Sequence, residues 1–241
     1  MEQLIGNMNS VLEKNNSYMT YFIAAYTLDG HPERVEVFKN SRHLALPHGY
    51  KHFNLRELSE TQAIQEIRKS KQTFEKYSLE SWCFRAPYAV NSISTQGKDK
   101  FYQILYDLNF QCSSSEFQED PPWKPQTHKI PEYVMARPSD DMLIDKLGIW
   151  DPKIFAKLCI KSIRNTKGSL IIFDMHPIRM GQKKFLNALN AICSFVNKDS
   201  NSVLLDFKTA ISSYREGQKD NFVCITGDID TWTYFDYLRR L

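Results

Sequence analysis

Residues 168–177 have the sequence Gly-Ser-Leu-Ile-Ile-Phe-Asp-Met-His-Pro, which contains the clearest buried strand in the chain. A short apolar run bounded by polar and turn-forming residues is typical of a strand that is buried on both faces. Helical patterns flank it, one opening at Asp151-Pro152 and the other covering residues 183–196. This order of elements predicts a parallel sheet with helices outside it.

The same alternation continues toward both ends of the chain. A capping box, Ser59 with Gln62, predicts a long helix that continues to Tyr77. Further helices are expected at residues 4–12, 32–38 and 98–108, and strands at residues 18–25, 44–46, 82–84, 110–113, 203–205 and within 221–241. These repeated units place the chain in the α/β class.

The length, the charge and the cysteine content of the chain restrict the range of functions. With 241 residues, 31 basic and 28 acidic, the formal net charge is only +3, and the scattered charges do not indicate a nucleic acid partner. The five cysteines form no C-x-x-C pair, so we expect buried thiols and no structural zinc cluster. The N-terminal residues 1–16 fit neither a signal peptide nor a membrane span, which favours a cytoplasmic location and no membrane partner.

We expect one domain over residues 1–217 and a C-terminal tail over residues 218–241. The tail carries Trp232, Tyr234 and Phe235, which would expose a large apolar patch if they stayed in solvent. We therefore predict that the tail packs on the domain or on a partner subunit. A homo-oligomer is one way to satisfy this expectation.

Two histidines, His48 and His52, follow the strand expected at residues 44–46. Imidazoles four positions apart on one turn point the same way, and with a carboxylate they make a three-ligand site for a divalent metal. The spacing alone also occurs by chance. Its position supports the metal site, because loops that follow parallel strands converge on one face.

Two more polar residues follow predicted strands. Arg85, in Phe-Arg-Ala-Pro-Tyr over residues 84–88, could hold a carboxylate, although a solvated surface turn would give the same pattern. His176 could protonate a leaving amine, or be a structural histidine. We expect Arg85 and His176 to point into the cleft that contains His48 and His52.

Taken together, these motifs resemble those of the polysaccharide deacetylases, carbohydrate esterase family 4, over roughly residues 8–214. His48-Gly-Tyr-x-His52 is similar to the second family motif, Arg85-x-Pro-Tyr88 to the third, and Asp-Met-His176 to the last. The resemblance implies a distorted (β/α) barrel, seven-stranded in the family. It also implies metal ligation by His48 and His52, usually to zinc, with Arg85 orienting the base, Tyr88 lending its backbone N–H to the oxyanion, and His176 as general acid.

The sequence departs from the family pattern at the first motif. The family's first motif, T-F-D-D-G, supplies the base and the third ligand, and it normally precedes the histidine pair. Thr27-Leu-Asp-Gly30 imitates it, but its spacing fits the loop after the second strand, so we expect the barrel to lack its first strand here. Asp29 could still act as a substitute carboxylate ligand. The residue that tunes the general acid would be Asp140 or Asp141.

The function implied is the metal-dependent removal of N-acetyl groups from an amino-sugar carbohydrate, with doubtful activity because the aspartate pair is not found where the family has it. Two alternatives remain. One is an inactive carbohydrate-binding or regulatory homologue, and the other is an amidase that acts on a small N-acetylated biosynthetic substrate.

Overall fold

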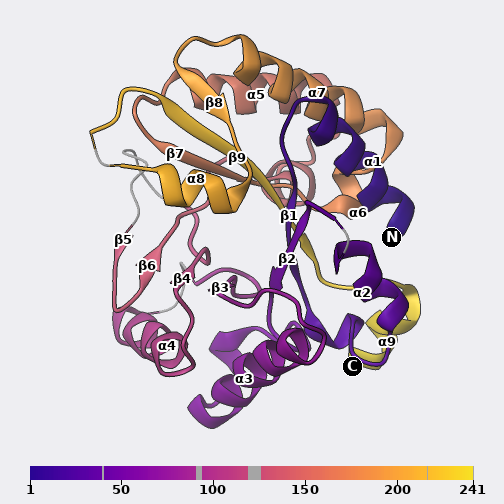
Figure 1. Cartoon of the computed structure of the whole chain (residues 1–241), viewed down its shortest axis with the longest axis vertical. Helices are drawn as coiled ribbons and strands as arrows, with labels where there is room; N and C mark the ends of the chain where they lie inside the picture. The colour runs from indigo at the N-terminus through magenta and orange to yellow at the C-terminus, as the bar shows by residue number, and fades with distance from the viewer. Residues whose placement is uncertain (40, 91–93, 119–125, 216, 241) are drawn as a thin grey trace. The chain divides into compact units, whose positions relative to one another are not determined.

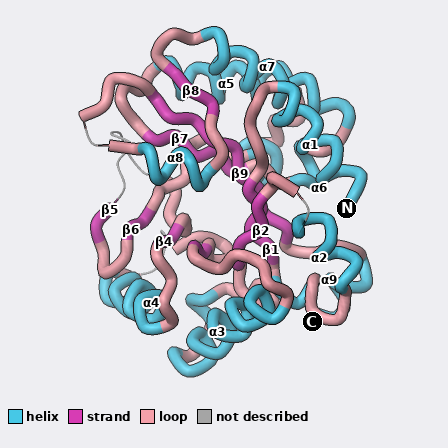
Figure 2. Tube along the Cα trace, viewed as in Figure 1, coloured by secondary structure: helices cyan, strands magenta, loops and turns pink. Residues whose placement is uncertain are grey.

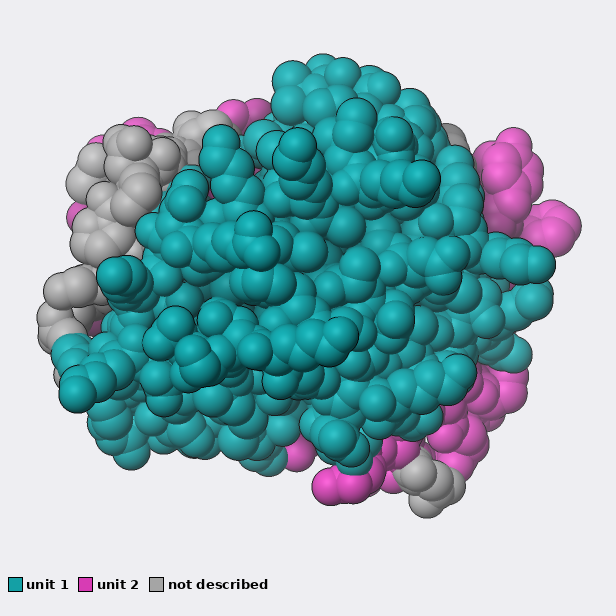
Figure 3. All heavy atoms as spheres, turned by 90° about the horizontal axis from the view of Figure 1, so that it is seen from above, with its two compact units in different colours: residues 1–20, 118–124, 135–228 teal, residues 21–117, 125–134, 229–241 magenta. Residues whose placement is uncertain are grey.

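The computed structural model describes residues 1–39, 41–90, 94–118, 126–215 and 217–240. The chain forms two compact units, each built from segments that are distant in sequence (Figure 3). Unit 1 comprises residues 1–20, 118–124 and 135–228, and unit 2 comprises residues 21–117, 125–134 and 229–241. The domain boundary expected at residue 217 stays a prediction.

Unit 1 contains a parallel sheet of three strands, β7 (Leu170–Asp174), β9 (Asn221–Ile229, up to Asp228 in this unit) and β8 (Ser202–Leu204), with β9 in the middle (Figure 1). All five residues of β7 are buried, as the apolar run of the sequence predicts. The helices of this unit are α1 (Glu2–Lys14), α5 (Pro152–Arg164), α6 (Pro177–Met180), α7 (Lys183–Lys198) and α8 (Phe207–Ser213).

The helices of unit 1 form where their sequences favour them. The Asp151 side chain accepts a hydrogen bond from Lys153 N, and Pro152 occupies the first turn of α5. The apolar faces of α5 and α1 both pack on α7, which also contacts β8 (Figure 2). The helix and strand expectations for this unit are therefore confirmed.

Unit 2 begins with β1 (Thr20–Ile23), whose neighbour is β2 (Leu44–Pro47). A second sheet has the order β3 (Cys83–Phe84), β4 (Cys112–Ser113), β6 (Pro131–Glu132) and β5 (Gln126–Thr127), parallel except for the β5–β6 pair. The helices are α2 (Pro32–Lys39), α3 (Glu60–Lys76), α4 (Thr95–Asp107) and α9 (Tyr234–Arg240). Two short 3-10 helices are η1 (Ala25–Thr27) and η2 (Leu55–Glu57).

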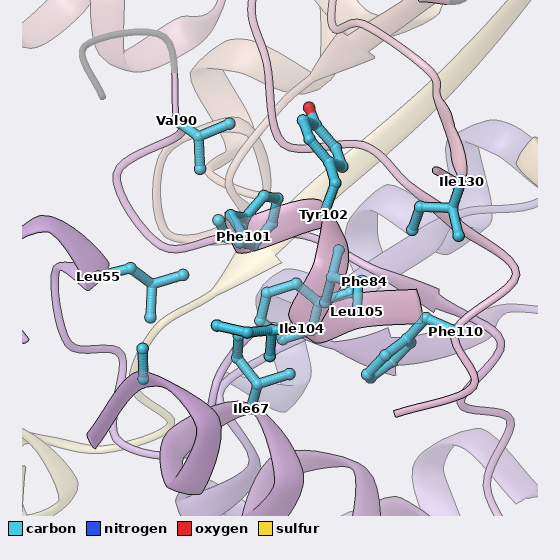
Figure 4. Packing of buried hydrophobic residues seen from close by; sticks show 12 residues of the cluster. Leu55, Ile67, Phe84, Val90, Phe101, Tyr102, Ile104, Leu105, Phe110 and Ile130 are labelled. Carbon is cyan, nitrogen blue, oxygen red and sulfur yellow. The ribbon is translucent and has the colours of Figure 1, made fainter. Parts of the chain in front are cut away.

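A cluster of buried apolar side chains joins α3, α4 and β3 (Figure 4). Ile67 of α3, Phe84 of β3 and Leu105 of α4 are fully buried in it. The capping box of α3 is present, with Ser59 and Gln62 bonded reciprocally. Burying this apolar face fixes α3 in unit 2, and with it the position of the polar side chains that α3 carries.

Other expectations are met in part. The long connection at residues 114–150 contains β5, β6 and a π-helix, η3 (Met142–Lys146). The cysteines are buried thiols, as expected. The α/β class with parallel sheets is confirmed, while closure of a barrel stays a prediction. None of the helices in the described part of the chain combines the length and the apolar character needed to cross a membrane.

Candidate metal centre and acid–base cluster

The loop after β2 carries both histidines of the predicted pair. His48 N donates to the carbonyl of Ile23, which ties the start of the loop to the end of β1. Gly49 has φ 74° and His52 has φ 59°, both in the left-handed region. Such a conformation is uncommon for a histidine and is concentrated at functional sites. Both imidazoles are buried, and their ring centroids lie 4.9 Å apart.

The carboxylate at this pair comes from the C-terminal segment of the chain. Asp230 Oδ1 lies 3.0 Å from His52 Nε2 and 3.6 Å from His48 Nε2. The three side chains offer one ligand atom each, all within 4.8 Å of one another, so they form a group that could hold a metal ion. Asp230 directly follows β9, and its backbone carbonyl accepts a hydrogen bond from the Tyr26 hydroxyl. Ile229 O likewise accepts from Ala24 N.

The tautomer of His48 follows from its surroundings. Its Nδ1 lies 2.9 Å from the carbonyl oxygen of Arg85, and since a carbonyl can only accept, Nδ1 carries the proton. The lone pair of the neutral ring is then on Nε2, the atom that faces Asp230. A backbone carbonyl on the second nitrogen is the usual way in which a metal-binding histidine is oriented.

Arg85 itself is fully buried and does not turn to solvent. Its Nε donates to Ser114 O at 2.9 Å and its Nη2 to Ser114 Oγ at 3.1 Å. The guanidinium also lies over the ring of Phe22, with 3.9 Å between Cζ and the ring centroid. Arg85 contacts His48 through its backbone carbonyl, while the direction of its side chain relative to the histidines and its role in orienting a base stay predictions.

Tyr88 borders the histidine pair. Its ring centroid lies 5.0 Å from that of His52, and its φ of 63° places it in the left-handed region, as does the 54° of Ala89. Ala86 N donates to Ser115 Oγ, which holds the start of this turn. The turn therefore has left-handed residues next to the group of His48, His52 and Asp230. The role of the Tyr88 N–H stays a prediction.

Asp29 does not belong to this group. Its carboxylate accepts hydrogen bonds from Lys76 Nζ at 2.8 Å and from the Tyr50 hydroxyl at 3.1 Å. The hydrogen bond with Lys76 lowers the pKa of Asp29 below its usual value. The side chain thus connects α3 to the loop after β2, and it is Asp230 that lies at the histidines.

Unit 1 contains the second group of side chains that could hold a metal ion or exchange protons: Asp174, His176 and Asp228. Asp140 is fully buried beside it, with Oδ1 2.8 Å from His176 Nδ1 and Oδ2 accepting from His176 N at 3.0 Å. Of the two aspartates that the sequence left open, Asp140 is the one that contacts His176.

These carboxylates control the charge of His176. Its burial lowers the pKa, but the negative charges of Asp140, Asp174 and Asp228 outweigh that effect and raise it well above the ordinary value. The raised pKa favours the protonated imidazole, the form that can give up a proton. The location of His176 relative to His48 and His52 stays a prediction.

Sequence reasoning missed Asp228 and Asp230. The signal was present in Ile225-Thr-Gly-Asp-Ile-Asp230, an apolar strand that ends in two aspartates, as the family's first motif does. It was missed because the family has this motif before the histidine pair, whereas here it comes near the end of the chain. The aspartates are also separated by Ile229 instead of being adjacent.

The comparisons with known proteins agree with this geometry. Residues 2–105 match the family model described as polysaccharide deacetylase. No curated protein matches the chain. A probable polysaccharide deacetylase from Pseudomonas aeruginosa PAO1 is similar with a TM-score of 0.67 and 14% identity, over 89% of this chain and 73% of that one.

Two further solved structures are similar in fold. A family 4 carbohydrate esterase from Streptomyces lividans, in complex with acetate, has a TM-score of 0.55 and 13% identity, over 80% of this chain and 81% of that one. A family 4 pseudoenzyme from Bacillus anthracis has a TM-score of 0.55 and 13% identity, over 92% and 59%. The chain is thus similar to the polysaccharide deacetylase family in its motifs, in residues 2–105, which match the family model, and in its fold.

Proposed function

We propose that this protein removes N-acetyl groups from an amino-sugar carbohydrate with the help of a divalent metal held by His48, His52 and Asp230. The observation that carries the proposal is the convergence of two imidazole nitrogens and one carboxylate oxygen within 4.8 Å. Three protein ligands with an open fourth position are the usual composition of a catalytic zinc site. This donor set fits zinc, which is our proposed metal.

The residues present fit such an ion in their chemistry as well as in their number. His48 and His52 are buried, and Asp230 Oδ1, the oxygen that faces them, is buried too, although the Asp230 side chain as a whole is 36% exposed. His48 has its Nε2 lone pair directed at the group by the Arg85 carbonyl. When bound, the metal supplies a Lewis acid that polarises an acetyl carbonyl and lowers the pKa of water.

The chain's own groups would perform the remaining steps. We assign proton donation to the departing amine to His176, because the neighbouring carboxylates raise its pKa and so favour its protonated form. Asp140 fixes the His176 ring through Nδ1, which leaves Nε2 to donate. Asp228 corresponds to the first aspartate of the family's T-F-D-D-G motif, and we assign to it the role of general base. Tyr88 N–H would stabilise the oxyanion.

One observation favours a second candidate, an inactive carbohydrate-binding homologue. Asp228 and Asp230 are separated by Ile229, whereas the family motif has adjacent aspartates. One of the similar structures is itself a family pseudoenzyme. Metal binding and carbohydrate binding without acetate release would support this candidate over an enzyme.

The test measures acetate released from N-acetylglucosamine oligomers by protein stripped of metal and reloaded with Zn²⁺. We expect release by the parent, and loss of both release and zinc in the Asp230→Asn variant. The Asp107→Asn variant is the matched control, since that exposed carboxylate contacts Gln103 and not the loop that carries the histidines. Release from small acetylated amides but not from oligomers would favour the amidase alternative, and zinc retained by Asp230→Asn would contradict the proposed site.

A further inference from the structure

The backbone of residues 48–53 depends on hydrogen bonds to other parts of unit 2. This loop, which we name the histidine loop, has left-handed residues at Gly49 and His52. Ala25 N donates to Gly49 O and Tyr26 N donates to Tyr50 O, both at 2.9 Å. The carbonyls of Gly49 and Tyr50 are thus bonded to η1. The N–H groups of the loop require acceptors from other elements.

Those acceptors are supplied by Glu66, from the middle of α3. Its Oε1 accepts from Lys51 N at 2.5 Å, and the backbone N–H groups of Tyr50 and Phe53 also donate to this carboxylate. The residue is only 7% exposed. Burial raises the pKa of Glu66, while the three backbone donors act in the opposite direction by stabilising its charged form.

The contact is close as well as polar. A Cβ at Gly49 would lie 3.4 Å from Glu66 Oε1 and 3.1 Å from Pro87 Cγ. The loop therefore fits tightly between the Glu66 carboxylate and the turn that follows Arg85. One carboxylate that accepts hydrogen bonds from three backbone N–H groups of the loop can determine where His48 and His52 project.

We propose that Glu66 is a positioning residue that holds the histidine loop in the conformation needed to bind the metal. The inference rests on the proposed metal site at His48, His52 and Asp230. A carboxylate is required because it offers acceptors only, whereas an amide of the same size would bring a donor against the backbone N–H groups. Outer-sphere residues of this kind change metal affinity about 10- to 100-fold.

The experiment compares Glu66→Gln with Glu75→Gln, a change on the same helix at an exposed glutamate that pairs with Lys71. The dissociation constant for Zn²⁺ is measured by competition with a chelator, and the Co²⁺ absorption spectrum reports the ligand geometry. We expect binding about 10- to 100-fold weaker and an altered spectrum for Glu66→Gln, and values within about twofold of the parent for Glu75→Gln. Thermal unfolding of the metal-free proteins separates loss of stability from loss of affinity.

A folded Glu66→Gln variant with the parent's zinc affinity and cobalt spectrum would overturn the inference. If that variant does not fold, Glu66→Asp decides, because it keeps the charge but is shorter by one methylene. We expect at least about threefold weaker zinc binding for it, and parental binding would overturn the inference. Zinc retained by His52→Ala would instead contradict the metal site itself, so the two failures are distinguishable.

Discussion

The segment that carries Asp230 is anchored by a buried ion pair, which makes a quantitative prediction possible. Asp236 of α9 is 1% exposed and Arg34 of α2 is 7% exposed. Asp236 Oδ2 accepts from Arg34 Nη1 at 2.9 Å, from Thr233 N at 2.8 Å and from Thr233 Oγ1 at 2.9 Å. Trp232 packs edge-on against Phe38 of α2, and α9 lies beside α2 (Figure 1).

The Asp236→Ala substitution removes the acceptor and leaves a buried guanidinium without its carboxylate. Breaking one partner of a buried pair costs about 3–5 kcal/mol. The same substitution also removes the hydrogen bonds that Thr233 donates to Asp236, and their loss adds about 0.5–2 kcal/mol to the cost. Since Arg34 Nη1 keeps its hydrogen bond to Thr27 O, we expect a total near the lower end of the sum, about 3.5–4.5 kcal/mol.

The assay is equilibrium unfolding in urea followed by circular dichroism, with Asp107→Asn as the control. Asp107 lies on the exposed surface of α4 and bonds only Gln103 among the described residues, so its change should stay within about 0.5 kcal/mol. Zinc affinity is measured on the same proteins, and we expect it to fall for Asp236→Ala because the anchor of Asp230 is loosened. A free energy of unfolding within about 0.5 kcal/mol of the parent would refute the reasoning.

Three further predictions concern other parts of the chain. The Asp230→Asn variant should bind Zn²⁺ at least about 100-fold more weakly than the parent, equivalent to about 2.8 kcal/mol, in a competition assay that leaves the affinity of Asp107→Asn unchanged. The Gly168→Ala variant should lose about 1–3 kcal/mol of stability in urea, because φ is 62° and the new Cβ would lie 2.1 Å from a backbone carbonyl oxygen. The Asp140→Asn variant should lower the pKa of His176 measured by NMR, since the nearest of the carboxylates that raise it is neutralised. A raised pKa stabilises the fold at low pH, and that contribution is lost as the pH rises through the folded value, so the variant should lose more stability below pH 6.5 than well above it.

Local signals in the sequence were sufficient for the elements and for two of the three side chains that could hold the metal, His48 and His52. The apolar run of β7 and the capping box at Ser59 predict a strand and a helix because both depend on neighbours within four positions. The histidine pair was likewise visible because its two ligands share one loop. The third ligand was not, because the pairing of a strand at the end of the chain with elements near its beginning depends on tertiary packing and not on local pattern.

Contacts between side chains on different elements could not be predicted from the sequence either. The spacing of charged residues does not reveal that Asp29 pairs with Lys76, since these lie on a loop and on the last turn of α3. For the same reason Glu66 looked like an ordinary helix residue, although its carboxylate is buried against the histidine loop. The cytoplasmic location, the tail's partner subunit and the oligomeric state stay predictions.

Because Asp230 lies far from the histidines in sequence, a bound ion would also cross-link distant parts of the chain. The aspartate and His52 are about 180 positions apart in sequence, so an ion that joins them closes a very long loop. Such a cross-link removes conformations from the unfolded chain and favours the native state by mass action, as a reversible staple would. Heating or chelation should therefore release the C-terminal segment first, and protection of that segment from proteases would report how much of the protein carries metal.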